Sequence, residues 1–333
     1  MQENYWCCEG TTPYGEKMKK KVAISIGDLN GIGIQLALEN HATLSREISP
    51  LYCIDKVMLQ QVAQKLNITI PHDFHTIENI APHFTIDAGV VSKESGAYAY
   101  ASFKKAVELA RKQEVDSICT LPIHKKAWEL AGVNYKGHTD ALRDFFDAEA
   151  IMMLGCNKMY VALFTEHIPL KEVAAVINEK DLTRFLVDFY HTAKPTSTVG
   201  VLGLNPHAGD DGVLGDEEII IQKAIDNATK TIKEKNPSLI THHSSLFTHP
   251  LVPDVAFTPN MRKNYTHYIA MYHDQGLAPL KALYFDEGIN VSLNLPILRT
   301  SVDHGTAFDI AYKGVKLNAL SYINAIKYIG EHL

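Results

Sequence analysis

The sequence lacks the features of membrane, nucleic-acid-binding and disulfide-stabilised proteins. It contains no run of about 18 apolar residues, so no transmembrane helix is expected. Acidic residues outnumber basic ones by 38 to 32, which gives a formal net charge of −6. The basic surface that nucleic-acid-binding proteins use is therefore not expected. The chain also has no internal repeat and no low-complexity linker, so no sharp domain boundary is visible in it.

Cysteine is scarce, and no two cysteines form a CxxC pair. Cys53 and Cys119 lie in apolar, strand-like runs, as the reduced buried thiols of cytosolic proteins do. The N-terminus has no apolar signal core, and a cytoplasmic location is expected. Residues 1–17 show no periodicity and are interpreted as an extension or a cloning remnant outside the fold. The cysteines are Cys7, Cys8, Cys53, Cys119 and Cys156.

The chain has 333 residues, enough for about two domains that each bury a core. Its composition, 46% hydrophobic and 21% charged, is ordinary for a globular protein. Short apolar runs alternate with amphipathic helical patterns, which predicts an α/β fold with helices on both faces of a largely parallel sheet. The predicted strands are residues 22–26, 117–121, 151–154, 160–164, 198–204, 268–271 and 290–295.

Two segments have clear helical periodicity. In residues 100–110 and 216–235 apolar side chains recur every three or four positions and form one helix face. The second segment has acidic residues in its first turn and lysines in its last, which matches the helix dipole, and Pro237 ends it. Its apolar stripe consists of Ile221, Ala224, Ile225, Ala228 and Ile232.

Residues 290–310 read NVSLNLPILRTSVDHGTAFDI and are the most informative stretch. An apolar strand is expected to end at Arg299 and to lead directly into a polar loop, residues 300–306. Buried polar groups are unfavourable unless they are paired, so this cluster indicates a site for a polar ligand rather than a folding core. Three other segments have the same character, namely residues 137–140, 203–215 and 271–281.

Three histidines stand where predicted strands end: His167, His207 and His273. Ligands of α/β sheets gather at the carboxyl ends of strands. These imidazoles are therefore candidates to converge on one divalent metal with an open position, as catalytic zinc requires. The alternative for each is a loop histidine held by one hydrogen bond. His242 and His243 are not expected to chelate together, because neighbouring residues of a strand point to opposite faces.

A second set of side chains suits an anion. Lys281 and Arg299 supply cations and Asn290 an amide, and His138 and Thr139 add further polar groups. Such groups bind phosphate or carboxylate. Solvated surface charge is the alternative, but it fits Arg299 poorly, because a buried guanidinium needs an anionic partner.

The glycine-rich stretch at residues 27–33, GDLNGIG, directly follows the first predicted strand. The Rossmann pattern requires G-x-G-x-x-G and an acidic residue about 20 positions further on, and this stretch does not match it. A tight strand-to-helix turn and an anion site at a helix N-terminus both stay open.

Together these segments resemble the 4-hydroxythreonine-4-phosphate dehydrogenase family of vitamin B6 biosynthesis, over nearly the whole chain from Met18. The family's signatures appear here as GDLNGIGIQ, KGHTD, GLNPHAGD, MYHDQG and LPILRTSVDHGTA, of which the last three are long and specific. The resemblance implies a homodimer with the active site at the subunit interface. It also implies a two-domain fold like that of isocitrate and isopropylmalate dehydrogenases, with three-layer α/β/α domains. Residues 18–128 and 305–333 would form the cofactor-side domain, and residues 129–304 the domain with the metal site and the dimer interface.

The resemblance also implies roles for single residues. The divalent metal would be bound by His167, His207 and His273, with ligands shared between subunits. Zinc is the expected metal, and magnesium and cobalt are the alternatives. The phosphorylated substrate would be held by His138, Thr139, Lys281, Asn290 and Arg299. The adenosine part of NAD or NADP would lie against Ser301, Asp303, His304, Gly305 and Thr306.

The implied activity is the oxidation of 4-phosphohydroxy-L-threonine to 2-amino-3-oxo-4-phosphooxybutanoate, which decarboxylates to 3-amino-2-oxopropyl phosphate in pyridoxal 5'-phosphate biosynthesis. The metal would lower the pKa of the substrate hydroxyl, a base would take its proton, and hydride would pass to the nicotinamide. The candidate bases are Asp254, Asp274 and Lys281.

The chain departs from the family pattern mainly in the first glycine-rich loop, at Leu29, Asn30, Ile34 and Gln35, and at His124. A related dehydrogenase of threonate or erythronate 4-phosphate is therefore the main alternative. A phosphate acyltransferase and a metal-dependent hydrolase are further alternatives. The acyltransferase would need no three-histidine metal site, and the hydrolase would need no adenosine loop.

Overall fold

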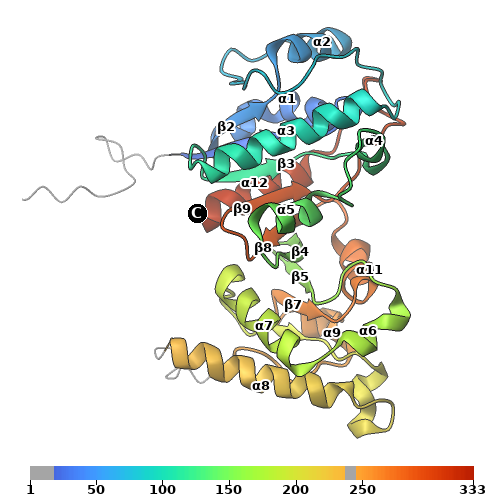
Figure 1. Ribbon diagram of the computed structural model, residues 1–333. Helices are drawn as coiled ribbons and strands as arrows, with labels where there is room; N and C mark the ends of the chain where they lie inside the picture. The colour runs from blue at the N-terminus through green and yellow to red at the C-terminus, as the bar shows by residue number, and fades with distance from the viewer. Residues whose placement is uncertain (1–18, 237–244) are drawn as a thin grey trace, which may run out of the picture. The chain divides into compact units, whose positions relative to one another are not determined.

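The computed structural model describes residues 19–236 and 245–333 and divides into two compact units. The first unit contains the described residues up to Ala131 together with Thr306–Val315 and Ile326–Leu333. The second unit contains Gly132–Gly305 and Lys316–Ala325. Both units combine β-strands with helices, so the predicted α/β class is confirmed (Figure 1). Residues 1–17 and the pair His242–His243 lie outside the described residues.

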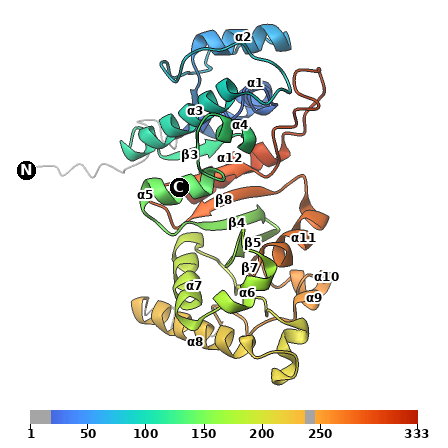
Figure 2. The ribbon, with the colours of Figure 1, turned by 45° about the vertical axis from the view of Figure 1, so that its right-hand side comes forward.

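The strands of the first unit are parallel, in the order β2 (Ile48–Cys53), β1 (Lys20–Ser25) and β3 (Ser117–Thr120). The long helix α3 packs across all three of them (Figure 2). Helix α4 approaches α3 closely because Gly96 has no side chain: a Cβ there would lie 2.0 Å from the carbonyl oxygen of Ala127. The helices are α1 (Gly33–Leu44), α2 (Lys56–Leu66), α3 (Lys93–Arg111), α4 (Lys125–Leu130) and the end of α12 (Leu320–His332).

The second unit has a mixed sheet in the order β9-β8-β4-β5-β7-β6. Strand β4 pairs antiparallel with β5 and β8, and β8 pairs antiparallel with β9, whereas β5, β7 and β6 run parallel. The prediction of a largely parallel sheet is wrong for this unit, because short connections join β4 to β5 and β8 to β9 and reverse the chain. The strands are β4 (Ile151–Cys156), β5 (Met159–Leu163), β6 (Gly200–Val201), β7 (His267–Ala270), β8 (Ile289–Leu293) and β9 (Leu298–Val302).

Helix α11 packs on β4, β5 and β7, and its Leu277 and Leu280 enter the apolar core there. Gly276 allows the close approach, because a Cβ at that position would lie 2.3 Å from Cγ1 of Val161. Helix α7 packs against α8 and contacts β8. The helices of this unit are α5 (His138–Phe146), α6 (Leu170–Val176), α7 (Glu179–Ala193), the 3₁₀ segment η1 (Pro206–Gly212), α8 (Glu217–Lys235), α9 (Pro253–Ala256), α10 (Pro259–Arg262) and α11 (His273–Tyr284).

The predicted strands each correspond to an observed strand, but β2 and β9 were not predicted. Strand β2 contains Pro50, which is tolerated because β2 lies at a sheet edge. The expectation that Arg299 ends a strand is wrong. The strand before it stops at Leu293, Asn294 turns the chain with a φ of 57°, and Arg299 lies inside β9. The three consecutive polar residues of β9, Arg299 to Ser301, resemble a loop in the sequence.

The two predicted helices are confirmed as parts of α3 and as α8, and the five apolar residues of the α8 stripe are 0–4% exposed. Cys53, Cys119 and Cys156 are buried thiols, as expected. Within the described part of the chain, no helix is both long and apolar enough to cross a membrane.

Candidate functional site

The three candidate metal-binding histidines follow three neighbouring parallel strands. Strand β7 lies between β5 and β6 in the second unit. His167 follows β5, His273 follows β7 and His207 follows β6. Because parallel strands end at the same edge, all three segments leave the sheet on one side, where ligands of α/β sheets bind.

Two of these imidazoles lie side by side: the ring centroids of His167 and His273 are 5.5 Å apart. The two rings are close because the residues just before them, Thr165 and Met271, are hydrogen-bonded to each other. The hydroxyl of Thr165 donates a 2.6 Å hydrogen bond to the carbonyl of Met271. Both histidines line a cavity of ≈ 330 Å³.

The start of α11 is fixed by Gln275, whose side chain is buried. Its amide donates to the carbonyl of Gly203 at 2.6 Å, and its carbonyl accepts from the backbone N–H of Met271 at 2.7 Å. Gln275 thus joins the segment that carries His273 to Gly203, the first residue of the GLNPHAG segment that carries His207. Nδ1 of His273 lies 2.7 Å from a carboxylate oxygen of Asp274. Since a carboxylate accepts, Nδ1 is the donor in this contact, which leaves Nε2 as the nitrogen available to a metal, the arrangement of metal-bound histidines.

His207 does not join this pair within one chain. It is exposed in η1. In residues 19–236 and 245–333, no group of three or more His, Cys, Asp or Glu side chains is arranged to hold a metal ion. The chemistry of His167 and His273 fits two ligands of a divalent metal, but a single chain does not complete the site.

The backbone around His207 is unusual. Residues 207–211 all have φ between 46° and 80°, in the left-handed region that non-glycine residues rarely adopt. A carboxylate supports this turn: Glu218 accepts from the backbone N–H groups of Leu204 at 2.8 Å and Asn205 at 2.7 Å. Asn205 in turn donates from its amide to Glu217 and Glu218. Strained turns of this kind persist at functional sites when the surroundings hold them.

Two of the candidate anion-binding residues, Asn290 and Arg299, share one face of β8 and β9. In the antiparallel register Asn290 faces Ser301 and Ser292 faces Arg299. These four side chains therefore form a polar patch on that face. Arg299 is 2% exposed, and its Nη1 donates to the hydroxyl of Ser292 at 3.1 Å.

His138 and Thr139 begin α5 and are both buried. Burial, and after it the positive charge of Arg299, holds the pKa of His138 well below its usual value. The imidazole is therefore neutral at physiological pH and offers one N–H donor without adding charge. The effect of Arg299 on its pKa shows that the two predicted anion ligands lie near each other.

Lys281 reaches from α11 to the end of β9, where its Nζ lies 2.8 Å from a carboxylate oxygen of Asp303. Burial raises the pKa of Asp303, and Lys281 opposes that rise. The ion pair with Asp303 occupies the ammonium of Lys281, which favours a role as a cation over a role as the base. The other two candidate bases, Asp254 and Asp274, are exposed.

The residues predicted to bind adenosine have different surroundings. Ser301 belongs to the polar patch, and Asp303 pairs with Lys281. His304 contacts the carbonyl of Gly305 through Nδ1. In the first unit, the carbonyl of Thr306 accepts from the backbone N–H of Ile32 at 3.0 Å. The cofactor role of these residues stays a prediction.

The glycine-rich loop at residues 27–33 has a clear structural role in the first unit. Gly31 is required because a Cβ there would lie 2.8 Å from the carbonyl oxygen of Thr306. Asn30 donates to the carbonyl of Val90 and accepts from the N–H of Asp87. The tight-turn interpretation of this loop thus has direct support.

Asp28 in this loop makes stability depend on pH. Its buried carboxylate accepts from the N–H of Asn30 at 3.0 Å and the hydroxyl of Ser95 at 3.1 Å, yet burial raises its pKa to about 6. In the unfolded chain the pKa is about 4. Between these values the folded protein holds a proton that the unfolded chain has lost, so the free energy of unfolding falls as pH rises.

As the pH rises from about 4 to about 7, the free energy of unfolding should therefore fall by about 2 kcal/mol more in the wild type than in Asp28→Asn, which has no carboxyl group to titrate. Urea unfolding at a series of pH values measures this difference. Asp116→Asn is the matched control, because the exposed Asp116 also accepts a backbone N–H, that of Lys21. Equal pH dependence of the wild type and Asp28→Asn would contradict the prediction.

Comparison with known proteins identifies the family of the chain. The model of the family described as "Pyridoxal phosphate biosynthetic protein PdxA" matches residues 42–329. A 4-hydroxythreonine-4-phosphate dehydrogenase of Sulfurimonas denitrificans is 56% identical over 318 residues, which cover 95% of this chain and 99% of the relative. The enzyme of the same name from Campylobacter fetus is 50% identical over 92% of this chain and 96% of its own length.

A crystal structure of 4-hydroxythreonine-4-phosphate dehydrogenase from Klebsiella pneumoniae has a TM-score of 0.76 and 30% identity, and covers 95% of this chain and 98% of its own. The resemblance inferred from the motifs is confirmed, as is the fold class. The chain therefore belongs to the PdxA family of pyridoxal phosphate biosynthetic proteins, together with relatives named 4-hydroxythreonine-4-phosphate dehydrogenase.

Proposed function

We propose that this protein is a nicotinamide-dependent dehydrogenase that oxidises 4-phosphohydroxy-L-threonine to 2-amino-3-oxo-4-phosphooxybutanoate. Loss of carbon dioxide from that product gives 3-amino-2-oxopropyl phosphate for pyridoxal 5'-phosphate biosynthesis. The observation that carries the proposal is the buried polar patch of β8 and β9 around Arg299, in a chain of this family.

The substrate's phosphate would be held by the patch and its neighbours. Arg299 supplies a planar fork of donors, Asn290 an amide and the neutral His138 one N–H donor. Charge-assisted hydrogen bonds of this kind bind phosphate strongly. Lys281, which pairs with Asp303, adds a cation. Thr139 completes the proposed set at the first turn of α5, whose backbone N–H groups also favour an anion.

The divalent metal would be held by His167 and His273 of one subunit and by His207 of the partner subunit. The 5.5 Å separation of the first two rings and the exposed position of His207 support a shared site in a homodimer. Zinc suits three imidazoles with an open position, and magnesium or cobalt are the alternatives. When bound, the metal would lower the pKa of the substrate hydroxyl and stabilise negative charge that develops on that oxygen.

NAD or NADP would accept the hydride, and the residues proposed against its adenosine are Ser301, Asp303, His304, Gly305 and Thr306. The proton of the substrate hydroxyl would leave to a base. Of the candidates, Asp274 is the best supported, because it is exposed and contacts His273. For Asp303, the hydrogen bond with Lys281 supports a role as the partner of that lysine more than a role in binding the cofactor.

The alternative substrates, threonate and erythronate 4-phosphate, are less well supported, because the relatives at 56% and 50% identity are both named for 4-hydroxythreonine 4-phosphate. The glycine-rich loop, where the departures from the family pattern lie, is packed against Thr306 and Val90. Its changes are therefore expected to affect packing before they affect substrate choice.

The test is reduced-nicotinamide absorbance on mixing the protein, oxidised cofactor and 4-phosphohydroxy-L-threonine, with and without a chelator. We expect a rise that the chelator removes and that added zinc, cobalt or magnesium restores. The threonate and erythronate 4-phosphates, at equal concentration, are expected to react at least about tenfold more slowly, because the loss of a hydrogen bond to a charged group weakens transition-state binding by about 1.5 kcal/mol or more. A faster reaction with either would transfer the proposal to that substrate.

A further inference from the structure

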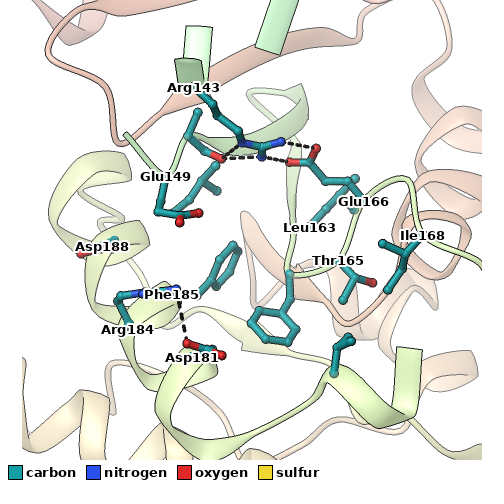
Figure 3. A pocket seen from close by; sticks show the side chains of 14 residues that line it. Arg143, Glu149, Leu163, Thr165, Glu166, Ile168, Asp181, Arg184, Phe185 and Asp188 are labelled. Carbon is teal, nitrogen blue, oxygen red and sulfur yellow. Dashed lines mark hydrogen bonds and ion pairs between the residues drawn. The ribbon is translucent and has the colours of Figure 1, made fainter. Parts of the chain in front are cut away.

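An ion pair between Arg143 and Glu166 connects two parts of the proposed site in the second unit. Arg143 lies on α5, one helical turn after Thr139, and its guanidinium forms a fork with the carboxylate of Glu166. The Nη2–Oε1 distance is 2.6 Å and the Nη1–Oε2 distance is 3.2 Å. Figure 3 shows this pair at the top of a cavity of ≈ 370 Å³.

The same guanidinium also holds the start of β4. Nε and Nη2 of Arg143 donate to the carbonyl of Ala150 at 3.2 Å and 2.7 Å. All three nitrogens of the group are therefore engaged, and the side chain has one orientation. A forked pair with such additional bonds is geometrically specific, unlike most surface ion pairs.

Glu166 stands directly before His167. Its side chain is 11% exposed, and Thr165 on its other side is anchored to Met271. The position of His167 relative to α5 is thus set by one carboxylate and one guanidinium. Neither residue touches the proposed substrate or metal ligands through an observed hydrogen bond, so both would act through their neighbours.

We propose that Arg143 and Glu166 are positioning residues that fix His167 relative to the first turn of α5, where His138 and Thr139 lie. This inference rests on the proposed function of those residues. The pair would set the distance between the phosphate end and the metal end of the bound substrate. Supporting residues of this kind typically change metal affinity or activity by roughly 10- to 100-fold when they are replaced.

The experiment uses the full-length protein with Arg143→Met, Glu166→Gln and the double variant. Cobalt affinity, read from its visible absorption, and affinity for inorganic phosphate are measured along with KM and kcat. We expect Arg143→Met to weaken cobalt binding and raise KM for the substrate, each by roughly 10-fold or more. The double variant should lose less than the product of the two single losses, because it does not leave Glu166 charged without its partner.

Arg184→Met is the matched control. Arg184 borders the same cavity and pairs with Asp181 at 3.3 Å on α7, but both side chains are about half exposed (Figure 3). It should behave as wild type. If Arg143→Met fails to fold, as judged by its unfolding transition, Glu166→Gln, which keeps the side-chain shape, carries the test.

Unchanged cobalt affinity and KM in the folded variants, with only a lower unfolding midpoint, would overturn the proposal, because a merely structural pair gives that result. Independent, multiplicative losses in the double variant would also overturn it. Cobalt and phosphate binding do not require turnover. A wild type that binds both but does not oxidise the substrate would refute the proposed function and leave the positioning role measurable.

Discussion

Replacing Arg299 with methionine is expected to lower kcat/KM for the phosphorylated substrate by roughly 10²- to 10³-fold, mainly through a higher KM. Arg299 is 2% exposed and shares a strand face with Asn290, Ser292 and Ser301. A guanidinium in such a place loses little free energy to solvent screening when it binds a phosphate. Methionine keeps the unbranched apolar stem and removes the guanidinium, so the loss measures the contact of the guanidinium with the phosphate.

Two further variants make this measurement specific. Arg299→Lys keeps the charge without the planar fork and should fall between wild type and Arg299→Met. Arg46→Met is the control, because Arg46 is exposed in the first unit beyond the end of α1. Initial rates over a range of substrate concentrations give the result. A folded Arg299→Met protein with wild-type KM would show that the phosphate is held elsewhere.

The second large effect concerns the metal site that we propose to be shared between two subunits. The homodimers of His207→Ala and of His273→Ala are each expected to lose more than about 10³-fold in metal-dependent rate, because neither keeps three imidazoles at any site. A heterodimer of the two variants can be purified through two different tags. It contains one complete site, in which the His207→Ala subunit supplies His167 and His273 and the His273→Ala subunit supplies His207. We expect it to regain about half of the wild-type rate, because one of the two symmetry-related sites is intact.

Metal content provides a second measurement that does not depend on turnover. The heterodimer should bind about half as much zinc as the wild-type dimer. His249→Ala is the matched control, because His249 is another exposed loop histidine, 2.8 Å from the side chain of Gln222, and the variant should keep full activity. A heterodimer as inactive as its parents would mean that all three ligands come from one chain. A monomeric wild type would exclude the shared site altogether.

The sequence alone was sufficient for features that depend on neighbouring residues. The α8 stripe could be predicted because apolar side chains three and four positions apart share a helix face. The histidines could be selected because each follows an apolar run in a polar segment, and MYHDQG and GLNPHAG identified the family. Strand β9 could not be predicted, because three consecutive polar residues are typical of a loop unless the partner strand β8 is known.

Tertiary structure decided which polar groups meet. Arg143 and Glu166 are 23 positions apart and Lys281 and Asp303 are 22 positions apart, and neither pair shares a local pattern. Gln275 reaches Gly203 across 72 positions. Sequence periodicity reports only which face of an element is apolar. The partner of a buried charge depends on the register and packing of distant strands and helices, and it is fixed only when the chain has folded, because an unpaired buried charge is unfavourable.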